Sequence, residues 1–201
     1  MPKTHQPLPK ILVITGSVRP KRFNIQPATW IHKTASQRPD AQFELVDLLQ
    51  INLPFLDEPI PPSQHQYSKS HTKNWSKIIE SADGFIFVTP EYNHSLSPAL
   101  KNAIDYLFIE WHYKPAAFIS YGSLAGGARA VEHLRAVCAE IKIYDLREQI
   151  MLPDYWDHTD QDGQYQFTDQ HEKLAQKLLD SLIFWSKVMR PPRQHLRKEV
   201  S

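Results

Sequence analysis

Three short stretches of the sequence carry residue types that can bind a ligand. They read GSVRPKRFN at residues 16–24, TPEYNHS at residues 89–95 and SYGSLAGGAR at residues 120–129. The first stretch offers hydroxyl, guanidinium and amide groups, which bind anions. The second brings an acid, an aromatic ring and an amide to one corner, and the third brings glycines that permit a close approach. These types suit a charged group in the first stretch and a flat ring in the second.

The stretch at residues 16–24 has the composition of a phosphate-binding loop. Ser17 follows a glycine at the end of an apolar run, and Arg19 and Arg22 precede a helical pattern. Free backbone N–H groups and the helix dipole attract phosphate at such a position, and arginines add charge-assisted bonds. Asn24 either caps the helix or reaches a phosphate oxygen. The stretch matches neither a Walker A loop nor GxGxxG, and a solvated basic loop is the alternative.

The stretch at residues 89–95 suits the edge of a flat heteroaromatic ring. Pro90 stiffens the exit from a strand and leaves the following N–H groups to face outward. Tyr92 offers a flat apolar face, and Asn93 tolerates left-handed dihedrals. The alternative is a turn whose tyrosine packs on the protein itself. Glu91 invites a role as general acid or base, but an acid in such a loop more often bonds neighbouring backbone, so we expect a backbone organiser.

The stretch at residues 120–129 is the least specific of the three. Gly126 and Gly127 remove side chains where either backbone or a ligand must approach closely. Tyr121 either stacks on a ring or closes the preceding strand. Taken alone, this stretch leaves both interpretations open.

Each stretch follows an apolar, β-branched run that predicts a buried strand. Five strands are predicted, at residues 11–15, 43–48, 84–89, 116–121 and 143–151. Helical patterns alternate with them, which predicts right-handed crossovers and a parallel sheet with helices on both faces. Ligands bind beyond the carboxyl ends of strands in such sheets, and the three stretches lie after the first, third and fourth strands.

One domain is expected, because no linker or internal repeat divides the chain. Residues 10–189 hold the predicted elements, with a final helix that begins at Asp169. Residues 1–9 are predicted to be a flexible N-terminus, and residues 190–201 a basic, proline-containing tail in solvent. Residues 49–72 form a long polar excursion, which is uncommon inside a compact domain and often functional.

Composition argues against several classes of function. The formal net charge is +1, so no strong field favours nucleic acid or a membrane surface. No apolar run approaches the roughly 20 residues of a membrane span. Ten histidines and one cysteine show no metal-ligand spacing, so no metal is expected. Cys138 is the single cysteine and lies on an apolar helix face, which together with the polar N-terminus predicts a cytoplasmic protein.

The three stretches together resemble the NAD(P)H-dependent FMN reductase family, the flavodoxin-like quinone, azo-dye and chromate reductases. The likeness rests on GSVRPKR, on TPEYNHS with PALKNAIDY, and on KPAAFISYG with GGARAVEHLR. WSKIIESADGFIFV and LPFLDEP are similar too, so the likeness covers roughly residues 10–152. The resemblance implies an α/β, flavodoxin-like three-layer sandwich with a five-stranded parallel sheet in the order 2-1-3-4-5.

By this resemblance the three stretches hold a tightly bound FMN. Its phosphate would lie against Ser17, Arg19, Arg22 and Asn24. Its isoalloxazine ring would be lined by Pro90, Glu91, Tyr92, Asn93 and Ser95 on one side and by Tyr121, Gly122, Gly126 and Gly127 on the other. Many relatives carry a second serine or threonine where this chain has residues 22–24, so the resemblance specifies the phosphate contacts less closely there.

The implied function is an FMN-dependent NAD(P)H oxidoreductase. Hydride would pass from NADPH or NADH to the flavin, and two electrons would then pass to a quinone, azo, chromate or flavin acceptor. Hydride transfer requires no protein acid or base, so no catalytic residue is assigned. Two other functions stay open: an electron carrier like flavodoxin, which is usually acidic and fits a net charge of +1 poorly, and a redox-sensing FMN-binding protein.

Self-association is also implied, because family members are commonly homodimers or homotetramers. A candidate contact surface is the helix at residues 100–107 with the aromatic residues Tyr106, Phe108, Trp111 and Tyr113. Core packing of the same residues is the alternative.

Overall fold

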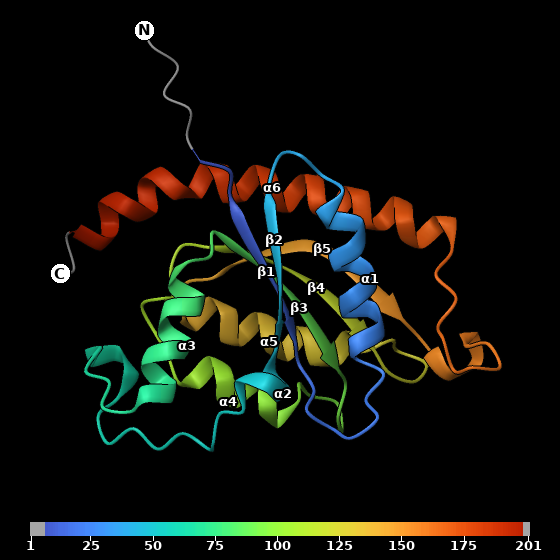
Figure 1. The fold of residues 1–201 in the computed structure, drawn as a ribbon, viewed down its shortest axis with the longest axis horizontal. Helices are drawn as coiled ribbons and strands as arrows, with labels where there is room; N and C mark the ends of the chain where they lie inside the picture. Colours follow the sequence, from blue (N-terminus) through green and yellow to red (C-terminus); the bar gives the residue numbers. More distant parts are fainter. Residues whose placement is uncertain (1–6, 199–201) are drawn as a thin grey trace, which may run out of the picture.

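The computed structural model describes residues 7–198 and shows a five-stranded parallel sheet between two layers of helices (Figure 1). The order across the sheet is β2-β1-β3-β4-β5, and every neighbouring pair is parallel. This confirms the predicted flavodoxin-like sheet. The strands are β1 (Lys10–Thr15), β2 (Gln42–Asp47), β3 (Gly84–Pro90), β4 (Pro115–Tyr121) and β5 (Tyr144–Leu152).

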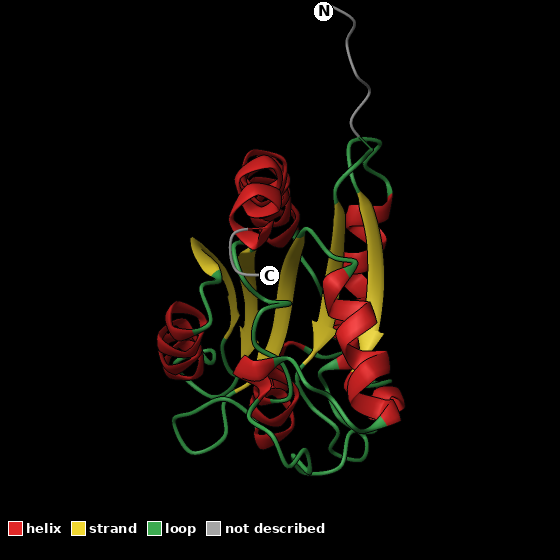
Figure 2. Ribbon diagram, turned by 90° about the vertical axis from the view of Figure 1, so that its left-hand side faces the viewer, coloured by secondary structure: helices red, strands yellow, loops and turns green. Residues whose placement is uncertain are grey.

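Helices cover both faces of the sheet (Figure 2). They are α1 (Ile25–Ser36), α2 (Leu48–Ile51), α3 (Ser70–Glu80), α4 (Pro98–Asp105), α5 (Ala128–Glu140) and α6 (Asp169–Lys198), with short 3-10 turns η1 (Pro62–Gln64) and η2 (Tyr155–His158). Helices α1 and α6 pack on one face, and α3, α4 and α5 pack on the other. The central strands are therefore buried on both sides, which is why they read as continuous apolar runs.

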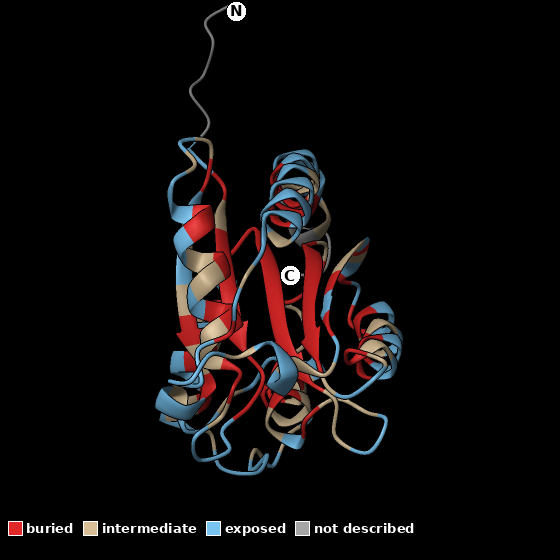
Figure 3. Ribbon diagram, turned by 90° about the vertical axis from the view of Figure 1, so that its right-hand side faces the viewer, coloured by how far each residue is buried: buried red, intermediate tan, exposed pale blue. Residues whose placement is uncertain are grey.

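The core has two parts because side chains alternate along each strand. Leu12 and Phe85 belong to the cluster under α3, α4 and α5, whereas Ile11 and Ile86 belong to the cluster under α1 and α6. Every residue of β3 and β4 is buried, and Figure 3 shows these strands in red between the helices.

The helix suggested as a contact surface packs mainly in the core. Leu100, Ile104 and Leu107 are buried against the sheet, and so are the rings of Tyr106 and Trp111. The indole N–H of Trp111 donates to the Ile104 carbonyl oxygen at 3.1 Å. The apolar side of this helix has the sheet as its partner, so the alternative interpretation, core packing, is the correct one for these residues.

Residues 190–198 of the tail predicted to lie in solvent are instead part of a helix. Helix α6 continues to Lys198, although Pro191 and Pro192 lack the N–H groups that a helix uses. Both Arg190 and Arg193 form ion pairs with Asp83, which precedes β3. A buried carboxylate needs such partners, and its position beside α6 explains why the basic end of the chain packs on the domain.

Residues 1–6 of the predicted N-terminal segment and residues 199–201 of the predicted tail lie outside the described residues. Along residues 7–198, no helix combines the length and apolar character that crossing a membrane requires.

Candidate functional site

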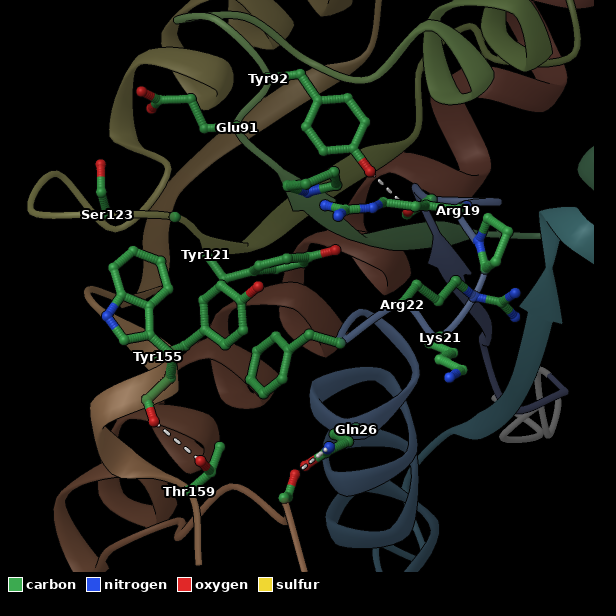
Figure 4. Close-up of a pocket in the computed structure, with 17 residues that line it drawn as sticks. Arg19, Lys21, Arg22, Gln26, Glu91, Tyr92, Tyr121, Ser123, Tyr155 and Thr159 are labelled. Atoms are coloured by element: carbon green, nitrogen blue, oxygen red, sulfur yellow. Dashed lines mark hydrogen bonds between the residues drawn. The ribbon is translucent and has the colours of Figure 1, made fainter.

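A cavity of about 730 Å³ lies at the carboxyl ends of the strands (Figure 4). It is lined by the loops after β1, β3 and β4 and by the segment that follows β5. The first three loops are those that the sequence analysis selected. The lining residues are Ser17, Arg19, Pro20, Lys21, Arg22, Phe23, Gln26, Pro90, Glu91, Tyr92, Tyr121, Gly122, Ser123, Tyr155, Trp156, Thr159 and Gly163.

The loop after β1 is locked against the neighbouring strand. The N–H of Gly16 donates to the Val88 carbonyl oxygen at 2.7 Å, and a Cβ at Gly16 would stand only 2.8 Å from that oxygen. Glycine is therefore required where β1 leaves the sheet. The hydroxyl of the buried Ser17 shares a hydrogen bond of 3.0 Å with the hydroxyl of Tyr92. This bond joins the two loops that were predicted to bind the two ends of one ligand.

The basic residues of this loop differ in their partners. Arg22 forms an ion pair with Asp47 at the end of β2, and the two side chains are only 10% and 11% exposed. In the described part of the chain, Arg19 and Lys21 take part in no ion pair. Most of the Arg22 charge is thus offset inside the protein, and Arg19 and Lys21 supply the positive charge that faces the cavity.

Asn24 is buried and does not line the cavity. Its amide nitrogen donates to the Val88 carbonyl oxygen at 2.8 Å, and it makes no side-chain bond that caps α1. Its side-chain oxygen is buried without a hydrogen-bond partner among the described residues, and the same holds for the Nε atom of Arg22. The loop after β1 therefore keeps one acceptor and one donor unsatisfied, which buried polar groups seldom are.

The loop after β3 is a tight turn. The N–H groups of Glu91 and Tyr92 donate to the carbonyl oxygens of Tyr121 and Ser95 at 3.0 and 2.9 Å. Asn93 and His94 both have left-handed backbone conformations, with φ of 49° and 68°. The expectation that the N–H groups after Pro90 face outward is therefore wrong for residues 91 and 92, because both are bonded to backbone.

Glu91 is the backbone organiser that the sequence predicted. Its carboxylate is 7% exposed and accepts hydrogen bonds from the backbone N–H of Arg129 at 3.1 Å and of Ala130 at 3.4 Å. It also accepts from the Arg129 Nε at 2.6 Å. These N–H groups begin α5, where a negative charge is favourable. Glu91 thereby fastens the loop after β3 to the loop after β4.

The two glycines after β4 are required by the backbone. A Cβ at Gly127 would lie 2.9 Å from the backbone nitrogen of Tyr121, and one at Gly126 would lie 3.1 Å from the backbone nitrogen of Pro153. Both have positive φ, +55° at Gly126 and +83° at Gly127. Neither lines the cavity, whereas Gly122 and the ring of Tyr121 do. Of the two explanations for the glycine pair, close approach of backbone is the one observed.

Comparison with known proteins agrees with this geometry. The profile of the NADPH-dependent FMN reductase family matches residues 9–157. The chain belongs to this family. An NAD(P)H-dependent FMN reductase from Nectria sp is 38% identical over 150 residues, which span 72% of this chain and 75% of that one. A 2-hydroxy-1,4-benzoquinone reductase from Burkholderia sp is 33% identical over 192 residues, covering 88% of this chain and 95% of that one.

A solved structure supports the fold of this family member. FerB, a flavoenzyme NAD(P)H:(acceptor) oxidoreductase from Paracoccus denitrificans, superposes with a TM-score of 0.72 at 22% identity, covering 90% of this chain and 99% of that one. The predicted class, an FMN-dependent NAD(P)H oxidoreductase, is confirmed by the family membership.

The cavity of this FMN reductase fits the cofactor of its family. One end carries the cations Arg19 and Lys21, and the lining residue Arg22 has a buried Nε donor without a partner among the described residues. The other end carries the flat faces of Tyr92 and Tyr121. A phosphate group matches the first end, and an aromatic ring system matches the second.

The predicted site residues divide into two groups. Eight of them line the cavity: Ser17, Arg19, Arg22, Pro90, Glu91, Tyr92, Tyr121 and Gly122. Five do not: Asn24, Asn93, Ser95, Gly126 and Gly127. Most of the second group support the first, since Asn24 and the glycine pair fix loop backbones and Asn93 forms the turn after Tyr92. Ser95 lies 3.0 Å from the Nδ1 atom of His133, on the far side of that turn.

The segment after β5 was missed by the sequence analysis. It contributes Tyr155, Trp156, Thr159 and Gly163 to the cavity. A signal for it was present, since PDYWDHTDQDG follows the fifth predicted strand at its carboxyl end, where ligand loops lie. The segment also carries two large aromatic residues in an otherwise acidic run.

Proposed function

We propose that FMN binds in this cavity, with its phosphate at the β1 loop and its ring between the β3 and β4 loops. The single observation that carries the proposal is that one cavity joins the cations Arg19 and Lys21 to the flat faces of Tyr92 and Tyr121. When bound, FMN supplies the chemistry, which is the acceptance of hydride from NADPH or NADH and the return of two electrons to an acceptor.

The β1 loop would bind and orient the phosphate. The Arg19 guanidinium contributes charge-assisted hydrogen bonds, and the Ser17 hydroxyl adds a donor held in place by Tyr92. The ion pair with Asp47 lowers the net charge that Arg22 offers and fixes the position of its side chain. Arg22 would therefore act mainly by shaping the loop, through its ion pair with Asp47.

The β3 and β4 loops would hold the ring. The pKa of Tyr121 is raised by burial and by the nearby Tyr92, so its ring stays uncharged at neutral pH and presents an apolar face. Glu91 keeps the two loops at a constant separation through α5. No side chain is assigned a proton-transfer role. Cys138 is buried in the core, and burial raises the pKa of its thiol, which makes it unreactive.

A visible spectrum of the purified protein tests cofactor and donor together. We expect a flavin band that bleaches on anaerobic addition of NADPH or NADH and returns on addition of a quinone. A flavin-containing protein that oxidises neither nucleotide would overturn the oxidoreductase assignment and favour an electron carrier or a redox sensor.

Two arginine variants test the roles within the β1 loop. Arg19→Ala is expected to weaken FMN affinity about 10-fold, the effect of losing a charge-assisted hydrogen bond of about 1.5 kcal/mol, without loss of folding stability. Arg22→Ala leaves Asp47 without its counter-charge and is expected to reduce the free energy of unfolding by about 2 kcal/mol or more. FMN titration by fluorescence and urea unfolding measure the two effects, and equal behaviour of the two variants would contradict the division of roles.

We propose a quinone as the acceptor, because the relatives include a benzoquinone reductase and the cavity walls are aromatic.

We also propose that the chain forms a homo-oligomer. Phe55 is 83% exposed, and Leu49, Leu56 and Val18 are exposed apolar residues that a second copy could cover. Sedimentation of Phe55→Asp, beside a matched Phe184→Asp control on α6, tests this contact. A cytoplasmic location stays a prediction.

A further inference from the structure

A second cavity lies at the opposite end of the sheet from the cavity described above, and we refer to it as the amino-end cavity. Its volume of about 740 Å³ is close to that of the first and falls in the usual range of small-molecule sites. Some of its lining residues precede strands: Glu80 ends α3 before β3, Tyr113 precedes β4 and Lys142 precedes β5. The lining residues are Ser63, Gln64, His65, Ser76, Lys77, Glu80, Phe108, Ile109, Glu110, His112, Tyr113, Lys142 and Leu196.

Five separate segments enclose the amino-end cavity. They are η1 with His65, helix α3, residues 108–113, Lys142 and the end of α6 at Leu196. Figure 1 shows α3 and the end of α6 on the same side of the molecule. The ion pair between Arg193 and Asp83 holds α6 there, one turn before Leu196. Walls from so many segments form a concave site of the kind that takes a small molecule.

A buried carboxylate fixes the shape of the amino-end cavity. Glu110 is 1% exposed and accepts hydrogen bonds from the Ser76 hydroxyl at 2.6 Å and from the Tyr67 hydroxyl at 3.0 Å. The Nε2 atom of His65 lies 3.2 Å from the same carboxylate. Because His65 and Tyr67 follow η1 and Ser76 lies on α3, Glu110 joins three of the walls. The cavity is therefore preformed, and its innermost acid already has donors within the protein.

Three residues of the lining have left-handed backbone conformations. The angle φ is 53° at His65, 60° at Tyr113 and 54° at Lys142, and none of the three is glycine. The Tyr113 N–H donates to the Lys142 carbonyl oxygen at 2.8 Å, so two of these residues are joined directly. Such conformations cost free energy and are concentrated at functional sites. The strained residues therefore mark the amino-end cavity as a candidate site.

The interior of the amino-end cavity suits a flat apolar ring. The ring of His112 meets Phe108 edge to face at a centroid distance of 4.6 Å and meets Tyr113 in the same way at 5.7 Å. Ile109 and Leu196 add aliphatic surface. An aromatic ligand gains both burial and edge-to-face contacts among such side chains.

Two lysines bring positive charge to the amino-end cavity. Lys77 and Lys142 are exposed, and neither takes part in an ion pair within residues 7–198. The Lys142 ammonium lies 5.6 Å from the centroid of the Tyr113 ring, beside the apolar part of the lining. Glu80 brings one carboxylate to the same lining. An anionic group of a ligand would find charge-assisted donors in the two lysines.

We propose that the amino-end cavity binds a small aromatic carboxylate, with its ring beside Phe108 and His112 and its anionic group at Lys77 and Lys142. The ligand class follows from apolar rings inside, cations at the mouth and an internal acid, Glu110, that already has its donors. No residue lines both cavities, so the site is separate from the proposed flavin site and does not depend on it.

Equilibrium dialysis of the purified full chain tests the site, with naphthoate and its uncharged amide, naphthamide, as matched probes. We expect naphthoate to bind more tightly, and its advantage to fade at high salt because exposed charges are screened. In Lys77→Gln/Lys142→Gln the dissociation constant for naphthoate should rise about 10-fold, the loss of a charge-assisted hydrogen bond, whereas that for naphthamide should stay constant. Lys73→Gln, which lies on α3 outside the cavity, is the matched control.

A steric variant tests where both probes bind. Ser63 is exposed on η1 and lines the cavity, so Ser63→Trp should fill the mouth and abolish saturable binding of naphthoate and naphthamide alike. Ser70→Trp, at the exposed start of α3 and outside the cavity, should bind both probes as the native protein does. Circular dichroism and urea unfolding confirm that each variant is folded, and the lysine variants test the site without added bulk.

The flavin absorption band distinguishes the two cavities. With FMN present, naphthoate bound in the amino-end cavity should leave that band unchanged. A shifted band, together with unchanged dissociation constants in the lysine and Ser63 variants, would place the probe in the other cavity and overturn the proposal. Absence of saturable binding at about 1 mM probe would overturn it as well. Failure of FMN to bind would leave the dialysis results intact, so the two proposals fail independently.

Discussion

Each end of the sheet buries a carboxylate that binds arginine, but the two clusters differ in how far water reaches them. At the amino end, Asp83 is 8% exposed and its partners Arg190 and Arg193 are also nearly buried. At the carboxyl end, Glu91 is equally buried, but its partner Arg129 is 44% exposed. The first cluster joins distant parts of the chain, because Asp83 also accepts from the Lys10 N–H at 2.9 Å. The second joins two loops beside the cavity.

Backbone strain follows the same division. In the described residues, left-handed conformations gather in the loops of the cavity end, at Lys21, Asn93, His94, Gly126, Gly127, Asp154 and Gly163. The connections at the amino end contain Tyr113 and Lys142, and the segment between α2 and α3 contains Asn52 and His65. Strained backbone persists only where surrounding contacts determine it, and it is concentrated at functional sites. The amino end of the sheet around Asp83 therefore contributes mainly to folding stability. At the carboxyl end, strained loop conformations cost free energy and give the cavity its shape.

The largest effect is expected from removal of the amino-end carboxylate. Asp83→Asn leaves two buried arginines without a counter-charge and should lower the free energy of unfolding by about 3 kcal/mol. Urea unfolding followed by circular dichroism measures it. Asp180→Asn is the matched control, because its pair with Arg38 is exposed and should contribute less than about 1 kcal/mol. If both variants lost equal stability, burial would not be what distinguishes the Asp83 cluster.

A smaller loss is expected from a glycine at the cavity end. Gly127→Ala combines a φ of +83° with a clash against Ser120 and should reduce the free energy of unfolding by about 2 kcal/mol. Gly163→Ala separates the two causes, because its φ is +73° but a Cβ there would meet nothing within 4 Å. It should lose only the conformational part, about 1 kcal/mol. Thermal unfolding measures both variants. Equal losses of unfolding free energy in Gly127→Ala and Gly163→Ala would show that the clash with Ser120 contributes nothing.

Glu91→Gln should reduce FMN affinity more than it reduces the free energy of unfolding. Because Arg129 is well hydrated, we expect a loss of only about 1 kcal/mol in unfolding free energy. FMN affinity should nevertheless fall several-fold, since the loops after β3 and β4 lose the carboxylate that joins them. Glu132 lies on α5, like Arg129, and its side chain is 73% exposed, so Glu132→Gln is the control. An unchanged FMN dissociation constant in Glu91→Gln would show that the loops hold their places without it.

The smallest effect concerns acid stability. Burial alone would raise the pKa of the Asp83 carboxyl, but hydrogen bonds from Arg190, the Lys10 backbone and Arg193 hold it below its usual value. A carboxyl with a depressed pKa contributes its full stabilisation above the unfolded value of about 3.9, and the contribution is lost as the pH falls below that value. The stability difference between the native protein and Asp83→Asn should therefore be constant from neutral to mildly acidic pH and shrink in stronger acid. A difference that changed most near neutrality would point to histidine instead.

Much of the fold could be predicted because it depends on local pattern. Short β-branched runs such as residues 11–15 and 84–89 predict buried strands whatever surrounds them. Ser97 and Pro98 predict the start of α4, and the Ser97 hydroxyl does accept from the Leu100 N–H at 3.1 Å. The loops of the site were also found, because ligands bind at the carboxyl ends of parallel strands.

The roles of individual residues within those loops depended on distant partners. Arg22 and Arg19 have the same side chain in the same loop, yet only Arg22 meets Asp47, which lies 25 positions further along the chain. The segment after β5 lies at the cavity, where Gln26, some 137 positions away from Gly163, donates a hydrogen bond to the Gly163 carbonyl oxygen. The end of α6 packs on the domain because Asp83 draws Arg190 and Arg193 to it. Local sequence carries the periodicity and turn chemistry that form strands, helices and loops, whereas burial and pairing of charges arise only when segments far apart in the chain come together.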